Sequence, residues 1–244
     1  MIPPSEVKVF VILSPVGPYF KDGFQPIKLY ADTVNVRAWP GGVGRNKLGG
    51  NYAPSVEPSR LAAAKHGCSQ VLWLFGEDKQ VTEVGSMNIF FVIRSEDGTY
   101  TELITPPLDR GDILPGVTRR SVLELTRDWI SSNPQKSFTF NSLPLVVSER
   151  WITLNEISAA SKAGRLLEVF GCGTAALLCP VQSIVSDDLE IEIPTPSISG
   201  QSSLMSLIWK TLSDIQVVRN SSMYFVGFYL LSVRSTAPSV VSGH

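Results

Sequence analysis

Two kinds of apolar pattern run through this chain without alternating regularly. Runs rich in β-branched and aromatic residues, such as Val71–Phe75 and Asn88–Arg94, predict buried strands. Apolar residues at helical spacing, as at Val122, Leu125 and Trp129, predict amphipathic helices. Because strands and helices are mixed without a strict strand–helix repeat, we expect one α/β domain of α+β character with a mixed sheet.

Local signals place further elements. Pro58 and Gly67 bracket a predicted helix over Glu57–His66, and Thr153 with Glu156 forms a capping-box pattern. A glycine at 164 would end the helix that the capping box begins. Further strands are expected at Val7–Leu13, Ile27–Tyr30, Val34–Trp39, Thr101–Thr105, Leu167–Phe170, Ala176–Cys179 and Ile191–Ile193, and a last helix at Gln201–Gln216.

Composition excludes several classes of function. The 244 residues carry a net charge of −1, without the basic field of a nucleic-acid binder. The longest apolar run, Met223–Val233, is about half the roughly 20 residues of a membrane span. Three cysteines and two histidines, with no C-x-x-C, argue against a metal site. We therefore expect no nucleic acid, no membrane and no metal as partners.

One lysine stands in a glycine-rich loop. Lys47 is flanked by Gly44, Gly49 and Gly50, where the backbone can approach another molecule closely. Most such lysines are solvated loop residues, but a partly desolvated amine can form a Schiff base. Tyr52 is then either a packed aromatic residue or a hydrogen-bond donor to a phenolic oxygen beside that amine.

Three further features complement Lys47. Glu83 stands shortly before the apolar run Ile89–Ile93 that predicts a buried strand. It is either a surface residue or a carboxylate that keeps a pyridine nitrogen protonated. The predicted helix start at Leu114–Arg119 and the turn at Gly171–Ala176 offer free N–H groups to an anion, although each alone is an ordinary turn. An amine, a pyridine partner and a phosphate cup together point to pyridoxal phosphate.

In this order, the segments resemble the eukaryotic branched-chain amino-acid aminotransferases, which are pyridoxal-phosphate enzymes of fold type IV. The resemblance spans about Val7 to Gln216 and implies the large cofactor-binding domain of the D-amino-acid-aminotransferase-like architecture. It is carried by Phe10–Phe20, Arg37–Trp39, Gly41–Tyr52, Gln70–Gly76, Thr82–Phe90, Thr105–Pro107, Ile113–Arg119 and Glu168–Pro180.

The resemblance implies a role for each matching residue. Lys47 would bind the cofactor as a Schiff base and carry a proton as general base and acid, while Glu83 would pair with the pyridine nitrogen. Tyr52 would contact the phenolic oxygen of the cofactor. The phosphate would be bound by Val117, Thr118 and Thr174, and the substrate would be contacted by Tyr19, Ser86, Ala175 and Ala176.

The same resemblance implies a domain division. Residues 1–20 would be the remnant of an interdomain connector, residues 21–216 the large domain, and residues 217–244 a divergent tail. The resemblance further implies that the small N-terminal domain of the family, which supplies an arginine to the phosphate, would have no counterpart in these 244 residues. Ala176 replaces the first cysteine of the mammalian C-x-x-C and leaves Cys179, so we expect that redox switch to be absent.

Two kinds of function stay open. The first is an enzyme that transfers the amino group of leucine, isoleucine or valine to 2-oxoglutarate and releases glutamate, as a homodimer when full-length, in the cytoplasm or mitochondria. The second is a non-catalytic truncated isoform or fragment that binds the cofactor, or a partner through exposed apolar surface.

Overall fold

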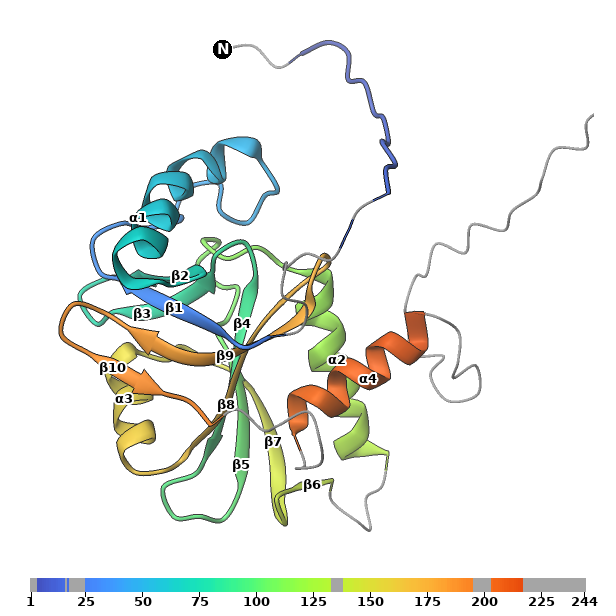
Figure 1. Ribbon diagram of the computed structural model, residues 1–244. Helices are drawn as coiled ribbons and strands as arrows, with labels where there is room; N and C mark the ends of the chain where they lie inside the picture. Colours follow the sequence, from blue (N-terminus) through green and yellow to red (C-terminus); the bar gives the residue numbers. More distant parts are fainter. Residues whose placement is uncertain (1–3, 16, 18–24, 133–137, 195–202, 217–244) are drawn as a thin grey trace, which may run out of the picture.

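The computed structural model describes residues 4–15, 17, 25–132, 138–194 and 203–216 (Figure 1). A ten-stranded sheet has the order β3-β2-β1-β9-β8-β4-β5-β7-β6, with β10 beside β9. The strands are β1 (Ile27–Asp32), β2 (Gln70–Phe75), β3 (Gln80–Val84), β4 (Asn88–Arg94), β5 (Thr101–Thr105), β6 (Thr139–Phe140), β7 (Leu143–Glu149), β8 (Leu166–Gly173), β9 (Leu177–Val185) and β10 (Glu190–Glu192).

The sheet is mixed, as the sequence predicts. β1 pairs in parallel with both β2 and β9, and β5 pairs in parallel with β7. The neighbours of β4, which are β5 and β8, run antiparallel to it. The described helices are α1 (Val56–His66), α2 (Val117–Ser131), α3 (Leu154–Lys162) and α4 (Leu204–Gln216), with short 3₁₀ turns at Gly49–Asn51 and Ala53–Ser55.

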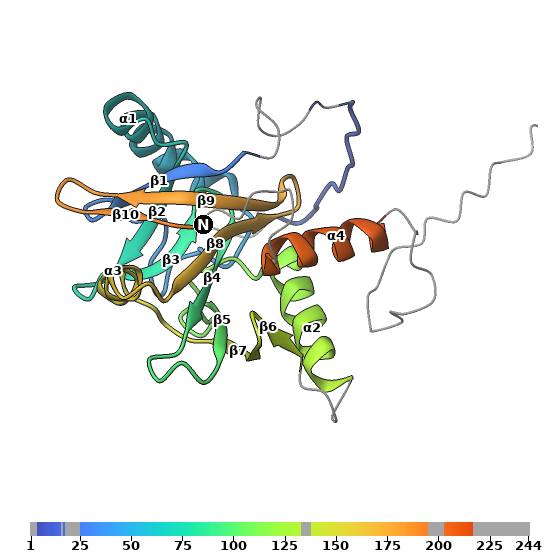
Figure 2. The same ribbon diagram turned by 60° about the horizontal axis from the view of Figure 1, so that its bottom comes forward.

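Strand β4 divides two hydrophobic cores. Its side chains alternate, so that Ile89 and Phe91 belong to the first core and Phe90 and Val92 to the second. The first core includes residues of β1–β4, β8–β10 and α3, and the second lies between β4, β5 and β8 and the helices α2 and α4 (Figure 2). This double burial explains why β4 is apolar along its whole length rather than at every second residue.

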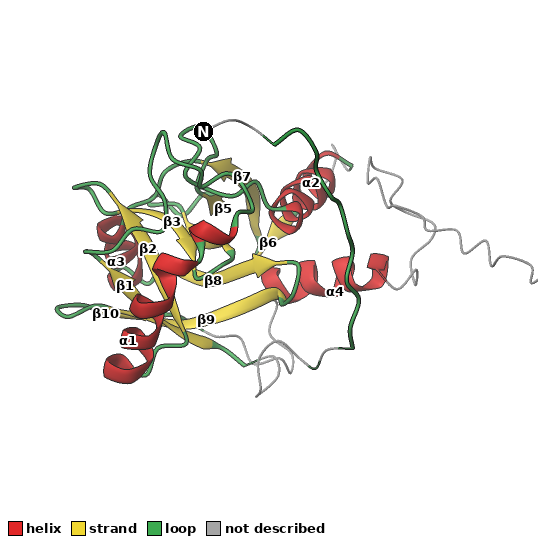
Figure 3. Ribbon diagram, turned by 90° about the horizontal axis from the view of Figure 1, so that it is seen from above, coloured by secondary structure: helices red, strands yellow, loops and turns green. Residues whose placement is uncertain are grey.

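Helix ends follow their sequence signals. The Thr153 side chain accepts a hydrogen bond from the backbone N–H of Glu156 at 3.1 Å, and Gly164 adopts φ +65° just after α3. Gly67 adopts φ +64° and ends α1, which packs near β2, at the opposite end of the molecule from α2 and α4 (Figure 3). The predicted helix boundaries at these positions are therefore confirmed.

Two predicted strands are absent. Val7–Leu13 has no paired neighbour among the described residues, and its large apolar side chains are 72–90% exposed. Without a partner strand, its β-branched composition cannot form a ladder. Val34–Trp39 is also not a strand, because Asp32 Oδ1 accepts hydrogen bonds from the N–H groups of Val34 and Asn35 and closes a turn at the end of β1.

A buried carboxylate attaches α4 to the sheet. Glu168 of β8 is 5% exposed, and its Oε1 accepts a hydrogen bond from the backbone N–H of Leu204 at 2.8 Å. Its Oε2 accepts from the N–H of Met205 and from the hydroxyl of Ser203, both at 3.0 Å. A carboxylate at this position also complements the positive end of the helix dipole.

Glu168→Ala is expected to lower the free energy of unfolding by at least about 2 kcal/mol, because it removes charge-assisted hydrogen bonds and leaves buried donors without acceptors. Chemical denaturation measures the effect. Glu192→Ala, on the exposed side of β10, is the control and should change stability by less than about 0.5 kcal/mol. Equal losses in the two variants would contradict the anchoring role of Glu168.

Candidate active site

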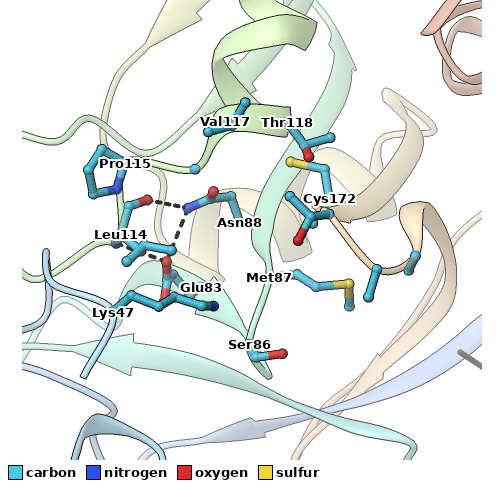
Figure 4. A pocket seen from close by; sticks show the side chains of 15 residues that line it. Lys47, Glu83, Ser86, Met87, Asn88, Leu114, Pro115, Val117, Thr118 and Cys172 are labelled. Atoms are coloured by element: carbon cyan, nitrogen blue, oxygen red, sulfur yellow. Dashed lines mark hydrogen bonds between the residues drawn. The ribbon is translucent and has the colours of Figure 1, made fainter. Parts of the chain in front are cut away.

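A cavity of about 350 Å³ opens where several elements end, a volume typical of small-molecule sites. Its walls come from the end of β3, the start of β4, the segment that enters α2, the turn between β8 and β9, and the loop that carries Lys47 (Figure 4). The lining residues are Lys47, Glu83, Ser86, Met87, Asn88, Leu114, Pro115, Gly116, Val117, Thr118, Cys172, Gly173, Thr174, Ala175 and Ala176.

The lysine loop is held by its own side chains. Asn51, 8% exposed, donates from Nδ2 to the carbonyl oxygens of Val43 at 2.9 Å and Asn46 at 2.8 Å, which closes the loop around Lys47. The Lys47 ammonium lies 5.0 Å from the centre of the Tyr52 ring. Lys47 itself is exposed, so the desolvation that a nucleophilic lysine needs is not supplied by the described part of the chain.

Glu83 is a buried carboxylate whose position is fixed by neighbours. It is 2% exposed, and its Oε1 accepts hydrogen bonds from Asn88 Nδ2 and from the backbone N–H of Leu114, both at 3.0 Å. Its Oε2 forms an ion pair with Nε of Arg37. Figure 4 shows Glu83 beside Lys47 at one wall of the cavity.

Burial raises the pKa of Glu83 to about 7, although Arg37, the Leu114 N–H and Lys47 oppose the shift and Asp112 adds to it. The folded chain therefore keeps a proton on Glu83 at pH values where the unfolded chain has lost it. The resulting stabilisation is complete below the ordinary glutamate pKa and is lost as the pH rises through about 7.

Without cofactor, the wild-type chain is therefore expected to lose thermal stability between pH 5 and pH 8, and Glu83→Gln to lose less of it, since the glutamine does not titrate. Differential scanning calorimetry across this range measures both melting temperatures. Glu77→Gln, an exposed glutamate before β3, is the control and should follow the wild type. Parallel curves for wild type and Glu83→Gln would contradict the perturbed ionisation of Glu83.

The start of α2 presents free backbone donors. Its N-cap is Gly116, which provides no side-chain cap, and the first turn contains no acidic residue. Val117 and Thr118 of this turn line the cavity. A Cβ at Gly116 would lie 2.1 Å from Oδ1 of Asn88, so a larger residue there would displace the Asn88 amide that donates to Glu83. The arrangement suits an anion.

Two tight turns complete the walls. Gly85 adopts φ +54°, and a Cβ there would lie 1.9 Å from Gln70 Oε1. Its carbonyl oxygen accepts a hydrogen bond from Trp73 Nε1 at 2.9 Å, which holds the adjoining Ser86 at the cavity. On the opposite side, Gly173 pairs with Leu177, and the residues between them form the tip of the β8–β9 turn.

The structure brings most predicted site residues together. Eight line the cavity, and the centre of the Tyr52 ring lies 5.0 Å from the ammonium of Lys47. Tyr19 is outside the described residues. Sequence reasoning missed the partners of Glu83: Arg37 belongs to a recognised segment, and Asn88 begins the apolar run of β4, but nothing local indicated that either would meet a carboxylate. The eight lining residues are Lys47, Glu83, Ser86, Val117, Thr118, Thr174, Ala175 and Ala176.

Two other kinds of site find no support in the part of the chain that the structure describes. None of its helices is long and apolar enough to cross a membrane. It also contains no group of three or more histidine, cysteine, aspartate or glutamate side chains placed to hold a metal ion.

Comparison with known proteins assigns the family. The model of the amino-transferase class IV family matches residues 3–184. The chain belongs to the class IV aminotransferases. This match includes the lysine loop, Glu83, the start of α2 and the β8–β9 turn, and so covers every described wall of the cavity.

Three relatives of this class IV aminotransferase share a name. A branched-chain-amino-acid aminotransferase of Monosiga brevicollis is 48% identical over 87% of the chain and 50% of its own length. The cytosolic enzyme of Caenorhabditis elegans is 46% identical over 88% of the chain and 49% of its own length. The mitochondrial enzyme of Schizosaccharomyces pombe is 48% identical over 85% of the chain and 46% of its own length. The chain thus spans about half the length of these relatives.

Solved structures agree with the fold. The branched-chain aminotransferase of Thermoproteus uzoniensis with norvaline superposes with a TM-score of 0.60 at 26% identity, over 85% of this chain and 56% of its own. The branched-chain amino acid aminotransferase of Thermobaculum terrenum in its PLP-form gives a TM-score of 0.56 at 24% identity, over 82% of this chain and 54% of its own. The expected fold-type IV architecture is therefore confirmed for this class IV aminotransferase.

Proposed function

We propose that the chain forms the large, cofactor-binding domain, residues 21–216, of a branched-chain amino-acid aminotransferase that uses pyridoxal phosphate. It would transfer the amino group of leucine, isoleucine or valine to 2-oxoglutarate. The observation that carries this proposal is the meeting of Lys47, Glu83 and the start of α2 at one cavity. The names of the relatives support the substrate class.

The residues fit the cofactor. A carboxylate has about four acceptor positions. Two bonds to Oε1 and the ion pair of Oε2 leave Glu83 one position for a protonated ring nitrogen. The uncapped N–H groups of Val117 and Thr118 suit a phosphate. In both respects the cavity provides what the two polar ends of pyridoxal phosphate require.

Pyridoxal phosphate supplies, when bound, an aldehyde that an amine attacks and a ring that accepts the electron pair released with a proton. Glu83 would keep the ring nitrogen protonated, and Tyr52 would contact the phenolic oxygen. Lys47 would bind the cofactor and then, released by the substrate amine, would remove the proton from the substrate α-carbon as general base and deliver it to C4′ of the cofactor as general acid. Thr174 would bind the phosphate with Val117 and Thr118.

The substrate would lie on the opposite side of the cavity from the start of α2. Ser86 and the backbone N–H groups of Ala175 and Ala176 would contact it, together with Tyr19. We further propose a homodimer for the full-length protein. Since relatives include cytosolic and mitochondrial enzymes, either compartment suits it.

Borohydride reduction tests the cofactor. The purified chain is incubated with pyridoxal phosphate, reduced and digested, and mass spectrometry should find the phosphopyridoxyl group on Lys47. A coupled assay with leucine and 2-oxoglutarate, with alanine as comparison, tests the reaction. An unmodified Lys47 would overturn the cofactor site. Modification without amino transfer from leucine would overturn the aminotransferase activity of this chain and indicate a cofactor-binding protein only.

A further inference from the structure

Arg37 is a buried arginine between β1 and the lysine loop. It is 6% exposed, and its side chain contacts three parts of the chain that are separate in sequence. Nη2 donates to the carbonyl oxygen of Gly44 at 3.1 Å, Nη1 lies 3.4 Å from the carbonyl oxygen of Asp112, and Nε pairs with Glu83 Oε2. Each contact reaches a different wall of the cavity.

The first of these walls carries the lysine. Gly44 lies three residues before Lys47, and its backbone touches that of Asp112 so closely that a Cβ would lie 2.6 Å from the Asp112 carbonyl oxygen. Beside this contact, the N–H of Arg45 donates to the carbonyl oxygen of Gly111 at 3.0 Å. Gly44–Arg45 and Gly111–Asp112 thus form a close backbone contact, here called the seam, between the lysine loop and the segment entering α2. Arg37 stabilises this seam because it contacts the carbonyl oxygens on both sides of it.

We propose that Arg37 is a positioning residue of this site, which holds the lysine loop and the α2 entry against Glu83 and supplies the buried counter-charge of that carboxylate. The inference rests on the proposed function for what Glu83 faces, a protonated ring nitrogen. Arg37 itself does not line the cavity, so it would act through Glu83 and the seam rather than on the cofactor.

The surrounding charges explain why a cation is needed. Glu83 faces Arg37 and Lys47, which favour its charged form, and Asp112, which opposes it. Asp112 is neutralised in turn by Arg110 at 2.7 Å, and the Arg110 guanidinium contacts the rings of Phe75 and Trp151. Without Arg37, burial and Asp112 would both raise the pKa of Glu83. The exposed Lys47 would then be the one remaining positive charge, among the described residues, that opposes them.

The shape of the guanidinium is as relevant as its charge. It offers donors in a rigid planar fork, and here those donors reach two carbonyl oxygens while Nε faces the carboxylate. A lysine would place one compact charge in the same space and could not bind all three acceptors in this geometry. The charge and the hydrogen bonds can therefore be tested separately.

The experiment uses the cofactor-free chain with ¹³C-labelled glutamate, in which NMR follows the titration of the Glu83 carboxylate. In Arg37→Met, the pKa of Glu83 should rise by about one pH unit or more relative to the wild type, a tenfold change in proton affinity. In Arg37→Lys it should stay close to the wild-type value, because the charge is kept. A purely structural residue would not produce this difference between the two variants.

Hydrogen exchange of the Arg45 amide tests the seam. Exchange should quicken about tenfold or more in both variants, because neither retains the bonds to Gly44 and Asp112. Arg45→Met, an exposed arginine in the same loop, is the control for charge removal and should leave the Glu83 pKa unchanged. Wild-type titration in Arg37→Met, or wild-type exchange in Arg37→Lys, would overturn the proposal.

Should Arg37→Met fail to fold, Arg37→Lys carries the test through the same two measurements: a Glu83 pKa near the wild-type value with faster exchange supports the proposal, and any other result overturns it. Both readouts are made without cofactor. Failure of the proposed function would instead appear as an unmodified Lys47 after borohydride reduction of the wild-type chain. The two hypotheses can therefore fail independently.

Discussion

Replacing Lys47 with alanine is expected to abolish the borohydride-stable attachment of pyridoxal phosphate, because no other amine lines the described cavity. Any amino transfer from leucine that the wild-type chain shows should fall by at least about 100-fold, since the variant loses its general base and acid. Stability should change little, because Lys47 is exposed. Mass spectrometry after reduction and the coupled assay measure the two effects.

A matched variant separates this chemistry from general charge effects. Lys65→Ala removes an exposed lysine from the last turn of α1, outside the cavity. It should retain both cofactor attachment at Lys47 and the wild-type rate. Attachment that persists in Lys47→Ala at the wild-type level would show that another lysine binds the cofactor.

Gly44→Ala should have the largest structural effect of the glycine substitutions in the lysine loop. The new Cβ would lie 2.5 Å from Ala38 Cβ and 2.6 Å from the Asp112 carbonyl oxygen, and backbone cannot rotate away as a flexible side chain can. Overpacking of this kind costs about 1–3 kcal/mol. Relief of the clash would part the seam, so the variant should also bind pyridoxal phosphate more weakly.

Gly50→Ala is the matched control, because a Cβ there meets nothing within 4 Å. It should be neutral or slightly stabilising, by up to about 1 kcal/mol, since it reduces the freedom of the unfolded chain. Urea denaturation and a cofactor titration compare the two alanines. A Gly44→Ala chain as stable as Gly50→Ala would show that the contact between the loop and Asp112 is not tight.

Elements with a strong local signal could be predicted from the sequence. β4 spans the predicted Asn88–Arg94, α2 begins at the predicted helix start, and the capping pattern at Thr153 marks the start of α3. The cavity residues were found because lysine among glycines and a glycine before a helix are local features. Each of these signals lies within a few neighbouring positions.

Long-range features could not be predicted in the same way. The Val7–Leu13 run has strand composition but no neighbouring strand among the residues that the structure describes, and composition alone does not reveal whether a partner strand is present. The pairing of Arg37 with Glu83 joins residues 46 positions apart, through a turn that Asp32 sets at the end of β1. The role of Glu168 in anchoring α4 likewise depends on a contact across 36 positions.

The alternation of side chains along β4 makes the cavity dependent on the whole domain. Ile89 and Phe90 belong to different cores, and the strand begins at Asn88, the side chain that donates to Glu83. Disorder in either core would displace β4 and with it that donor. Local melting of the site is then coupled to cooperative unfolding, and a ligand that binds only the folded site would protect both cores equally.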